Sequence, residues 1–352
     1  MLFGRKNQLI GLDIGTSSLK IAEIHNTKKG LFLKKIAVEK FSPDVFSDGE
    51  PKDPQHLSSL IRDAFMRNKI GNKNVAMSIG GYSAIVKPIT ITAKEDQDIH
   101  NLVFEEAEHY IPFDISEVSI DYQIMGELDQ NPNQLSVLLV AAKNDMINKY
   151  VSIAENAGLN PVVMDIDAFA VQNIFEINEP DVENAVLINV GANKISLNVV
   201  NNRKSVFMRE VAMGSFEITQ AIMSLNSDLT LEEAEKIKAG SIASDKVGRL
   251  DVEQAIAVVS KEWCVEIERA LEFFYSNNQA QKVEKVYVCG GGSVIEKFRN
   301  DLSSYIEAEV IQLNPFQVIE TGKSGWSKDE LSAIGPELCV ALGLGLRTMD
   351  DK

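Results

Sequence analysis

The segment Gly11-Leu-Asp-Ile-Gly-Thr-Ser-Ser-Leu-Lys20 returns in altered form 176 residues later as Leu187-Ile-Asn-Val-Gly-Ala-Asn-Lys-Ile-Ser196. Each copy reads as a strand, a tight glycine turn and a second strand, and Gly15 aligns with Gly191. Because glycine has no side chain and tolerates unusual backbone conformations, the N–H groups of such a turn can point at a phosphate. Two copies, one in each half of the chain, predict two lobes that bind one polyphosphate between them.

The first hairpin carries a carboxylate, Asp13, two residues before Gly15. A carboxylate cannot contact a phosphate directly without repulsion, so we expect it to hold Mg²⁺, which would bridge the phosphate oxygens. Hydroxyl groups, backbone donors and a positive charge follow in Thr16, Ser17, Ser18 and Lys20. Taken alone, the motif also suits an ordinary charged hairpin tip, and the repeat is what favours a nucleotide site.

The second hairpin differs from the first where Asn189 stands in place of Asp13. Its predicted tip is formed by Gly191, Ala192 and Asn193. An amide can act as a ligand or a hydrogen-bonding group, but it has no negative charge. Asn189 is therefore a poorer magnesium anchor than an aspartate and cannot orient an attacking water as a base.

Composition limits the class of protein. The 352 residues exceed the roughly 250–300 at which one core stops growing, so two domains are expected. A net charge of −16 argues against nucleic acid and anionic lipid as main partners. The three cysteines have neither zinc-site spacing nor the pattern of a disulfide framework. With no signal peptide or apolar run of about 20 residues, the sequence predicts a soluble, cytoplasmic protein.

Hydrophobic patterning predicts an α/β chain interrupted by a compact β/α insert at residues 83–143. Within the insert we expect a helix over residues 95–110, stopped by Pro112, and a turn at residues 129–133 between two strands. Outside it, we expect strands at 8–14, 18–25 and 31–38, the repeat hairpin at 185–200, a strand near 204–212 and a helical block over 216–277.

Two weaker signals lie in the second half. Gly290, Gly291, Gly292 and Ser293 connect a buried strand to a helix, where the backbone can approach a flat ring and the helix N-terminus favours anions. Glu235 and Lys238 lie on a predicted helix that could meet ribose hydroxyls. From spacing alone, the better interpretation is that these residues lie on a solvent-exposed face of the helix and form ion pairs along it.

In this order, the motifs resemble those of the actin-like nucleotide-binding superfamily: a phosphate-1 hairpin, a phosphate-2 hairpin, an adenosine glycine turn and a small-residue closing helix, here residues 333–347. The resemblance implies an actin-like (ribonuclease H-like) fold of two lobes with a nucleotide cleft. It implies a first lobe of residues 1–182 plus 326–352 and a second lobe of residues 183–325, with a helical subdomain at about 215–265.

Within that superfamily the chain is most similar to the PilM family of the type IV pilus assembly platform, over essentially its whole length. The most particular segments are residues 104–113 and 117–122, in the insert. PilM shares with the division protein FtsA a subdomain placed differently from that of actin, and residues 83–143 would be that subdomain. Glu235 and Lys238 match the ribose-contacting helix of the family, which reverses the interpretation from spacing.

The resemblance implies ATP or ADP with Mg²⁺ as cofactors and the N-terminal cytoplasmic segment of PilN, an inner-membrane protein, as partner. Other platform proteins and the assembly motor are further partners that it suggests, with membrane association only through them. The PilN groove would lie at the first lobe and its insert. We expect Tyr110, Ile111 and Phe113 to form one wall, although the same residues equally suit the core of the insert.

Asn189 and Asn193 depart from the superfamily pattern, which has an aspartate at the first position and often a hydroxyl residue at the second. The departure predicts nucleotide binding with slow turnover or none. Two alternatives are an active ATPase or kinase on the same fold and an FtsA-like division protein. A kinase should carry a base carboxylate in the first lobe, and no candidate stands out. FtsA ends in an amphipathic membrane-targeting helix, whereas this sequence stops at Lys352, soon after the closing helix.

Overall fold

The repeated hairpins lie in two sheets that share the same arrangement of five strands, and the first sheet has β16 as a sixth. The computed structural model describes residues 8–47, 49–81, 84–92, 98–128, 131–240, 245–278, 282–322 and 325–351. In each sheet a three-stranded antiparallel meander continues into two parallel strands. The first has the order β10 (Asn160–Ile166), β6 (Asn74–Ile79), β1 (Ile10–Ile14), β2 (Ser18–Thr27), β3 (Gly30–Lys40) and β16 (Ile319–Glu320). The second has the order β13 (Lys204–Val211), β12 (Ile195–Asn201), β11 (Ala185–Val190), β14 (Lys285–Cys289) and β15 (Glu309–Gln312).

The first lobe consists of the first sheet and helices α1 (Pro54–Arg67) and α3 (Asn144–Asn156), which pack on one face of it. A capping residue marks the start of α1, and a glycine marks the end of α3. The Asp53 side chain accepts a hydrogen bond from the His56 N–H at the start of α1. Gly158 follows α3 with φ +80°, a conformation that glycine adopts without strain. Apolar side chains from both helices and the sheet form one buried core, which includes Leu12, Ile21, Phe65 and Ile153.

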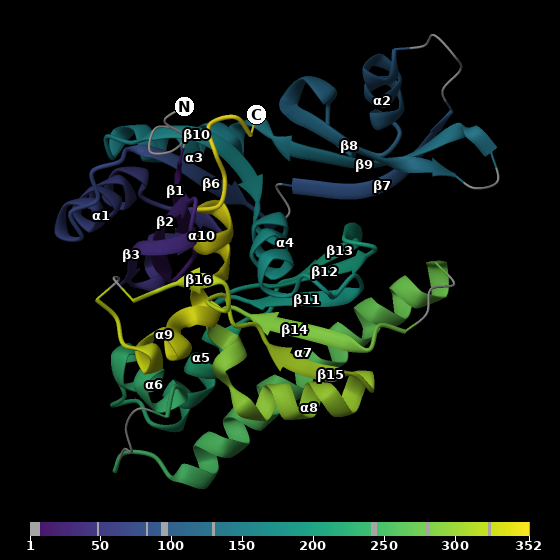
Figure 1. Cartoon of the computed structure of the whole chain (residues 1–352). Helices are drawn as coiled ribbons and strands as arrows, with labels where there is room; N and C mark the ends of the chain where they lie inside the picture. The colour runs from purple at the N-terminus through teal and green to yellow at the C-terminus, as the bar shows by residue number, and fades with distance from the viewer. Residues whose placement is uncertain are drawn as a thin grey trace.

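Helices α4 (Asp167–Asn178) and α10 (Cys339–Leu344) lie between the two sheets, as Figure 1 shows. Their buried side chains share a core with the inner faces of both sheets. Gly343 makes this packing possible, because a Cβ there would lie 1.8 Å from the Ala170 carbonyl oxygen. The two helices therefore connect the lobes through continuous apolar contact.

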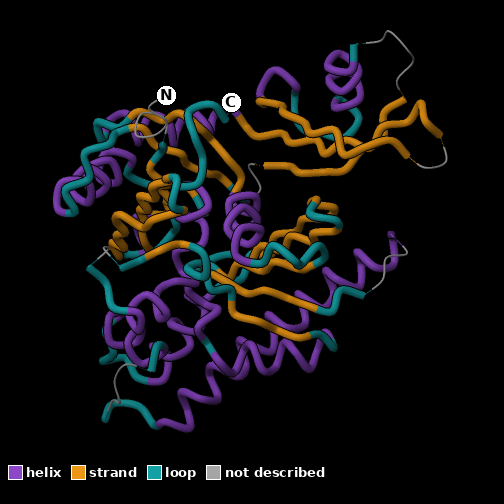
Figure 2. The backbone as a smooth tube through the Cα atoms, viewed as in Figure 1, coloured by secondary structure: helices purple, strands orange, loops and turns teal. Residues whose placement is uncertain are grey.

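The second lobe is the second sheet with helices on its outer face: α5 (Ser215–Leu225), α6 (Leu231–Lys238), α7 (Arg249–Asn278) and α8 (Glu296–Ile306). Thr230 and Glu233 form a complete capping box at the start of α6. Trp263 of α7 is fully buried and packs edge-on against Phe298 of α8, with ring centroids 5.4 Å apart. Figure 2 shows how helical this lobe is compared with the insert.

The insert is a three-stranded antiparallel sheet with the order β7 (Ala84–Thr92), β9 (Asn131–Lys143) and β8 (Val118–Leu128), and helix α2 (Ile99–Ala107) packs on it. It has its own apolar core, as its pattern predicted. Of the predicted residues 95–110, the helix covers Ile99–Ala107, and Asp98 caps its start by accepting from the His100 N–H. Residues 95–97 of that prediction lie outside the described residues. The turn predicted at residues 129–133 is also shorter, since Asn131 already pairs with Leu128; residues 129 and 130 lie outside the described residues.

Two predictions about the C-terminal segment were wrong. Residues 333–347 do not form one closing helix: α9 (Lys328–Ile334), a 3-10 turn η5 (Gly335–Leu338) and α10 follow one another. Pro336 explains the break, because proline lacks an N–H and restricts the residue before it. The chain also returns to the first sheet at β16, before the predicted residue 326.

Several short elements connect the longer helices and strands. They are η1 (Pro43–Val45), β4 (Phe46–Ser47), β5 (Glu50–Pro51), η3 (Ile115–Glu117) and η4 (Gly291–Val294). Within the described residues, no helix combines the length and apolar character needed to cross a membrane.

Candidate functional site

The first hairpin holds a largely buried ion pair. Asp13 and Lys20 face each other across β1 and β2, and the Lys20 Nζ lies 3.3 Å from the Asp13 Oδ2. Burial raises the pKa of Asp13 despite the attraction of Lys20. Burial alone would lower the pKa of Lys20, but Asp13 and Glu337 outweigh it and the pKa is raised. The pair therefore places opposite charges at the predicted metal and phosphate site.

The backbone of this hairpin is partly used in closing its own turn. The Gly15 N–H donates to the Ser18 carbonyl at 3.1 Å, so it is not directed outward. Thr16 and Ser17 are half-buried, and the buried Ser18 donates its Oγ to the Glu337 Oε1 at 3.4 Å. Thr16 and Ser17 thus stand at the turn as predicted, whereas the Ser18 hydroxyl already contacts η5.

The tip of the second hairpin is held against the start of α5. The Ser215 N–H donates to the Gly191 carbonyl and the Phe216 N–H to the Ala192 carbonyl, both at 2.9 Å. Gly214 permits this approach, because a Cβ there would lie 2.2 Å from the Ala192 carbonyl oxygen. Asn193, the last predicted tip residue, is exposed. The second tip is consequently well ordered by contacts within its own lobe.

The structure brings the glycine turn to the second hairpin. Gly290 has φ +84°, and a Cβ there would lie 2.4 Å from the Asn189 Oδ1. A Cβ on Gly292 would lie 2.3 Å from the Val190 Cγ1. The fully buried Ser293 donates its Oγ to the Gly290 carbonyl at 2.7 Å, so its hydroxyl closes the turn. Gly291 is exposed.

Glu235 and Lys238 join α6 to α5. The Lys238 Nζ lies 2.7 Å from the Glu235 Oε1 and 2.8 Å from the Thr219 Oγ1. It also donates to the Ser215 carbonyl at 3.2 Å. Burial lowers the pKa of Lys238. Since Ser215 also touches the second hairpin and approaches Gly292, the predicted ribose residues belong to the same connected site.

Sequence reasoning missed an acidic residue at the centre of this site, Asp167. Its Oδ1 accepts from the Ser78 Oγ at 2.7 Å, and its Oδ2 accepts from the Lys194 Nζ at 2.8 Å. Burial alone would raise the pKa of Asp167, but Lys194 and Ser78 together hold it below its usual value. The sequence carried a usable signal. Asp167 directly follows β10 and Asp13 is the next-to-last residue of β1, and both strands run parallel to β6, which lies between them. The carboxyl ends of parallel strands meet at one edge of the sheet.

Glu337 of η5 is a second missed residue. It accepts from Ser18 and raises the pKa of Lys20, and its charge also acts on Lys238 of the second lobe. The neighbouring Pro336 carbonyl accepts from the Gly290 N–H at 2.7 Å. The 3-10 turn that interrupts the predicted closing helix is thus in contact with both the first hairpin and the glycine turn.

The side chains fit a magnesium nucleotide. Among the described residues there is no group of three or more His, Cys, Asp or Glu side chains arranged to hold a metal. Mg²⁺ does not need one, since it usually takes one or two carboxylates and completes its shell with waters and phosphate oxygens. Asp13 and Asp167 influence each other electrostatically and supply two carboxylates, and Lys20 and Lys194 supply positive charge.

The predicted peptide-binding residues divide into two kinds. Ile111 is 5% exposed and lies in the core of the insert, as the alternative interpretation held. Tyr110 and Phe113 are half-buried. The Lys87 Nζ lies 4.9 Å from the Tyr110 ring centre, and the Lys143 Nζ lies 4.2 Å from that of Phe113. A role for Tyr110 and Phe113 in peptide binding stays a prediction.

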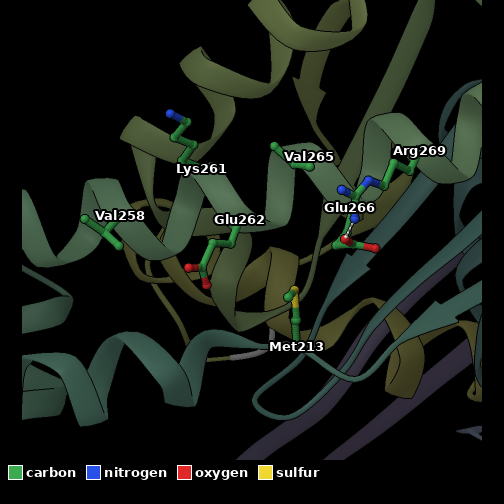
Figure 3. Close-up of a pocket in the computed structure, with 7 residues that line it drawn as sticks. All are labelled: Met213, Val258, Lys261, Glu262, Val265, Glu266 and Arg269. Carbon is green, nitrogen blue, oxygen red and sulfur yellow. Dashed lines mark hydrogen bonds and ion pairs between the residues drawn. The ribbon is translucent and has the colours of Figure 1, made fainter.

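A cavity of about 520 Å³ lies along the outer face of α7 (Figure 3). Its charged side chains have both signs, and Glu266 pairs with Arg269. None of the residues predicted from the sequence lines it. The lining residues are Met213, Val258, Lys261, Glu262, Val265, Glu266 and Arg269.

Comparison with known proteins gives a family match and several similar structures. A family model described as type IV pilus assembly protein PilM matches residues 11–349. The chain is also similar to a chain in the solved PilM–PilN type IV pilus biogenesis complex, with 27% identity and a TM-score of 0.83. That alignment covers 96% of this chain and 98% of the other, so it includes both lobes and the insert.

Two more distant structures bear on the fold alone. The ethanolamine utilization protein EutJ from Carboxydothermus hydrogenoformans is 14% identical, with a TM-score of 0.59 and coverage of 98% of this chain and 91% of EutJ. MreB5 of Spiroplasma citri, solved bound to AMPPNP, is 13% identical, with a TM-score of 0.52 and coverage of 96% and 95%. The fold is therefore actin-like, which confirms the predicted fold class.

Proposed function

Because the chain belongs to the PilM family of type IV pilus assembly proteins, we propose that it is an adaptor of the pilus assembly platform that binds the N-terminal cytoplasmic segment of PilN. The observation that carries this proposal is the similarity to a chain of the PilM–PilN complex, which extends over nearly the whole length of this chain and of that one. The insert, where the sequence predicts the groove, lies within the aligned region. Association with the inner face of the inner membrane would follow from PilN, an inner-membrane protein.

The proposed adaptor binds ATP or ADP with Mg²⁺ between its two lobes. Asp13 would hold the metal, which neutralises phosphate charge when bound. Lys20 and the backbone of the second tip would bind the phosphates, and the glycine turn with Glu235 and Lys238 would hold the nucleoside. The first hairpin, the second tip, the glycine turn and α6 are joined by contacts into one connected site, which supports the proposal.

Slow hydrolysis is part of the same proposal. Asn189 has no charge with which to activate a water. Asp167 is the other acidic candidate, but both of its oxygens accept hydrogen bonds, and its pKa is held low by Lys194 and Ser78. A carboxylate stabilised in this way is a weak general base. These features suit a bound nucleotide with a structural or regulatory role.

The test is a calorimetric titration of the purified chain with the N-terminal cytoplasmic peptide of PilN. Tyr110→Ala and Phe113→Ala should weaken binding by roughly tenfold each if these rings anchor the peptide. Phe273→Ala is the matched control, because Phe273 is an exposed aromatic residue on α7, in the second lobe. Absence of binding to the wild-type chain would refute the adaptor proposal. Normal binding by both insert variants would refute only the predicted wall.

A further inference from the structure

An ion triplet joins the two lobes beside the predicted phosphate site. The Lys194 Nζ lies 2.8 Å from the Asp167 Oδ2 and 3.1 Å from the Glu210 Oε1. Asp167 begins α4, whereas Lys194 and Glu210 belong to the second sheet, in the β11–β12 turn and in β13. The side chains of Lys194, Asp167 and Glu210 are 34%, 18% and 27% exposed, so the triplet is partly shielded from solvent. Such charge-assisted contacts are stronger than those on a fully exposed surface.

The triplet packs directly on the end of β6. A Cβ on Gly80 would lie 2.2 Å from the Lys194 Nζ, 2.5 Å from the Asp167 Oδ2 and 3.0 Å from the Glu210 Oε1. Gly80 immediately follows β6 and precedes β7, the first strand of the insert. The three charged groups therefore meet where the first lobe, the second lobe and the insert come together.

Strand β13 connects Glu210 to the insert. Figure 1 shows β13 beside β7, and residues of the two strands are in contact. At the other end of β13, the Lys204 ammonium donates to the Met125 carbonyl of β8. Any change in the pairing of Glu210 therefore acts on a strand that touches the insert at two places.

Lys194 is also the charged group nearest in sequence to the second phosphate tip. It follows Asn193 directly and aligns with Ser18 of the first hairpin. Its positive charge lowers the pKa of Asp13, the predicted magnesium ligand, although burial of Asp13 is the larger effect. The ammonium thus pairs with two carboxylates and belongs to the residue next to the tip where the phosphates are proposed to bind.

We propose that Lys194 exchanges partners between this ion triplet and the terminal phosphate of a bound nucleoside triphosphate, and that the exchange transmits the nucleotide state through Glu210 and β13 to the insert. The inference rests on the proposed nucleotide site. Phosphate oxygens compete with carboxylates for the same ammonium donors. A diphosphate lacks the terminal group and leaves the triplet intact, so the two nucleotide states differ in whether Glu210 is paired.

The first experiment compares the affinities of the full chain for ADP and for a non-hydrolysable ATP analogue, both with Mg²⁺, by calorimetry. Lys194→Met should reduce affinity for the analogue about tenfold more than affinity for ADP, which corresponds to about 1.4 kcal/mol. Lys297→Met is the matched control, since Lys297 pairs with Asp301 on the exposed side of α8. Equal losses for both nucleotides in a Lys194→Met variant that keeps the wild-type melting temperature would overturn the inference.

A second variant, Glu210→Gln, removes a carboxylate that competes for the Lys194 ammonium and leaves Lys194 itself in place to contact the phosphate. Glu210→Gln weakens the triplet but keeps Lys194, so affinity for the analogue should rise severalfold while affinity for ADP stays unchanged. Hydrogen exchange in residues 84–92 and 204–211 should increase in Glu210→Gln without nucleotide, and in the wild type when the analogue replaces ADP. A fall in analogue affinity, or exchange that does not change in either case, would overturn the inference.

These outcomes distinguish this inference from the nucleotide proposal. If the wild-type chain binds neither nucleotide, the nucleotide site is refuted and the exchange falls with it. If the wild type binds both and Lys194→Met keeps both the wild-type ratio of affinities and the wild-type melting temperature, the nucleotide site stands and the exchange alone is refuted. A folding defect in Lys194→Met would appear as an equal loss for both nucleotides and a lower melting temperature, with Glu210→Gln still giving the deciding result.

Discussion

Asp13 and Lys20 face each other across β1 and β2 as an ion pair, whereas the equivalent residues of the second hairpin, Asn189 and Ser196, face each other as a neutral pair. The two backbones follow the same path. In the proposed nucleotide site, the first hairpin would therefore supply the metal-binding charge, and the second would supply a backbone tip. The one ammonium at the second tip, that of Lys194, is engaged by carboxylates.

Asp13→Ala should abolish Mg-ATP binding and lower stability. The change removes the proposed metal ligand and leaves the Lys20 ammonium in a site where its side chain is 12% exposed. Breaking such a pair by deleting one partner costs about 3 kcal/mol of unfolding free energy. Urea denaturation and calorimetry measure the two effects. The double variant Asp13→Ala with Lys20→Met should recover most of the stability but none of the binding. ATP affinity unchanged in Asp13→Ala would refute the assignment of the cleft.

Gly290→Ala should destabilise the second lobe, and Gly291→Ala should not. Gly290 has φ +84°, and a Cβ there would meet the Asn189 Oδ1 at 2.4 Å and the Val190 carbonyl oxygen at 2.5 Å. A non-glycine residue at positive φ costs about 1–3 kcal/mol before any clash is counted. Gly291 has open space at its Cβ position, which makes it a close control. Equal urea midpoints for the two variants would show that the turn does not need this close approach.

The acid dependence of stability should show opposite contributions from Asp167 and Asp13. The pKa of Asp167 is held below its usual 3.8 by Lys194 and Ser78, which outweigh burial. Its contribution to stability is therefore present above pH 3.8 and is lost as pH falls through the lower folded-state pKa. Asp167→Asn should thus be less sensitive than the wild type to acid below about pH 4.

Asp13 provides the contrast, because burial raises its pKa. A raised carboxyl pKa disfavours folding at neutral pH, and the cost is relieved as pH falls through the folded-state value towards 3.8. Asp13→Asn removes that relief, so its stability should decline more steeply than that of the wild type from neutral pH down to about pH 4. Melting temperatures between pH 7 and pH 3 test both signs. Identical pH profiles for the two variants would contradict the assigned electrostatics.

Lys238→Met should weaken ATP and ADP binding equally, by roughly tenfold, and leave their ratio unchanged. The ammonium connects Glu235, Thr219 and the Ser215 carbonyl, so its loss disturbs the proposed ribose contacts without touching the phosphates. Lys236→Met on the same helix is the control, since Lys236 is half-exposed and pairs with Glu232 one turn away. A lower melting temperature with unchanged affinities would mean that Lys238 only holds α6 on α5.

Steady-state ATP hydrolysis should be barely above background. The expected cause is the absence of a charged base at Asn189, together with the engaged oxygens of Asp167. Asp13→Asn, purified in the same way, measures contaminating activity. Turnover on the order of 1 s⁻¹, normal for a modest enzyme, would contradict the adaptor proposal and favour an active ATPase.

The features that could be predicted from the sequence are those encoded within a few residues. The strand–turn–strand repeat, the capping box of Thr230 and Glu233 and the αL glycine at Gly158 all depend on neighbours along the chain. The apolar periodicity was sufficient for the core of the insert. It could not tell whether Ile111 faces that core or a partner, because a buried anchor and a core residue share the same composition.

The contacts that complete the site join residues far apart in the chain, and tertiary structure alone decided them. Lys194 meets Asp167 from 27 residues away, and Ser18 meets Glu337 from 319 residues away. The strand order brings the ends of β1, β6 and β10 together, and α4 and α10 pack between the sheets. A single sequence specifies which side chains carry charge, but the pairing of those charges depends on which strand ends and helix termini the packed core brings within a few ångströms.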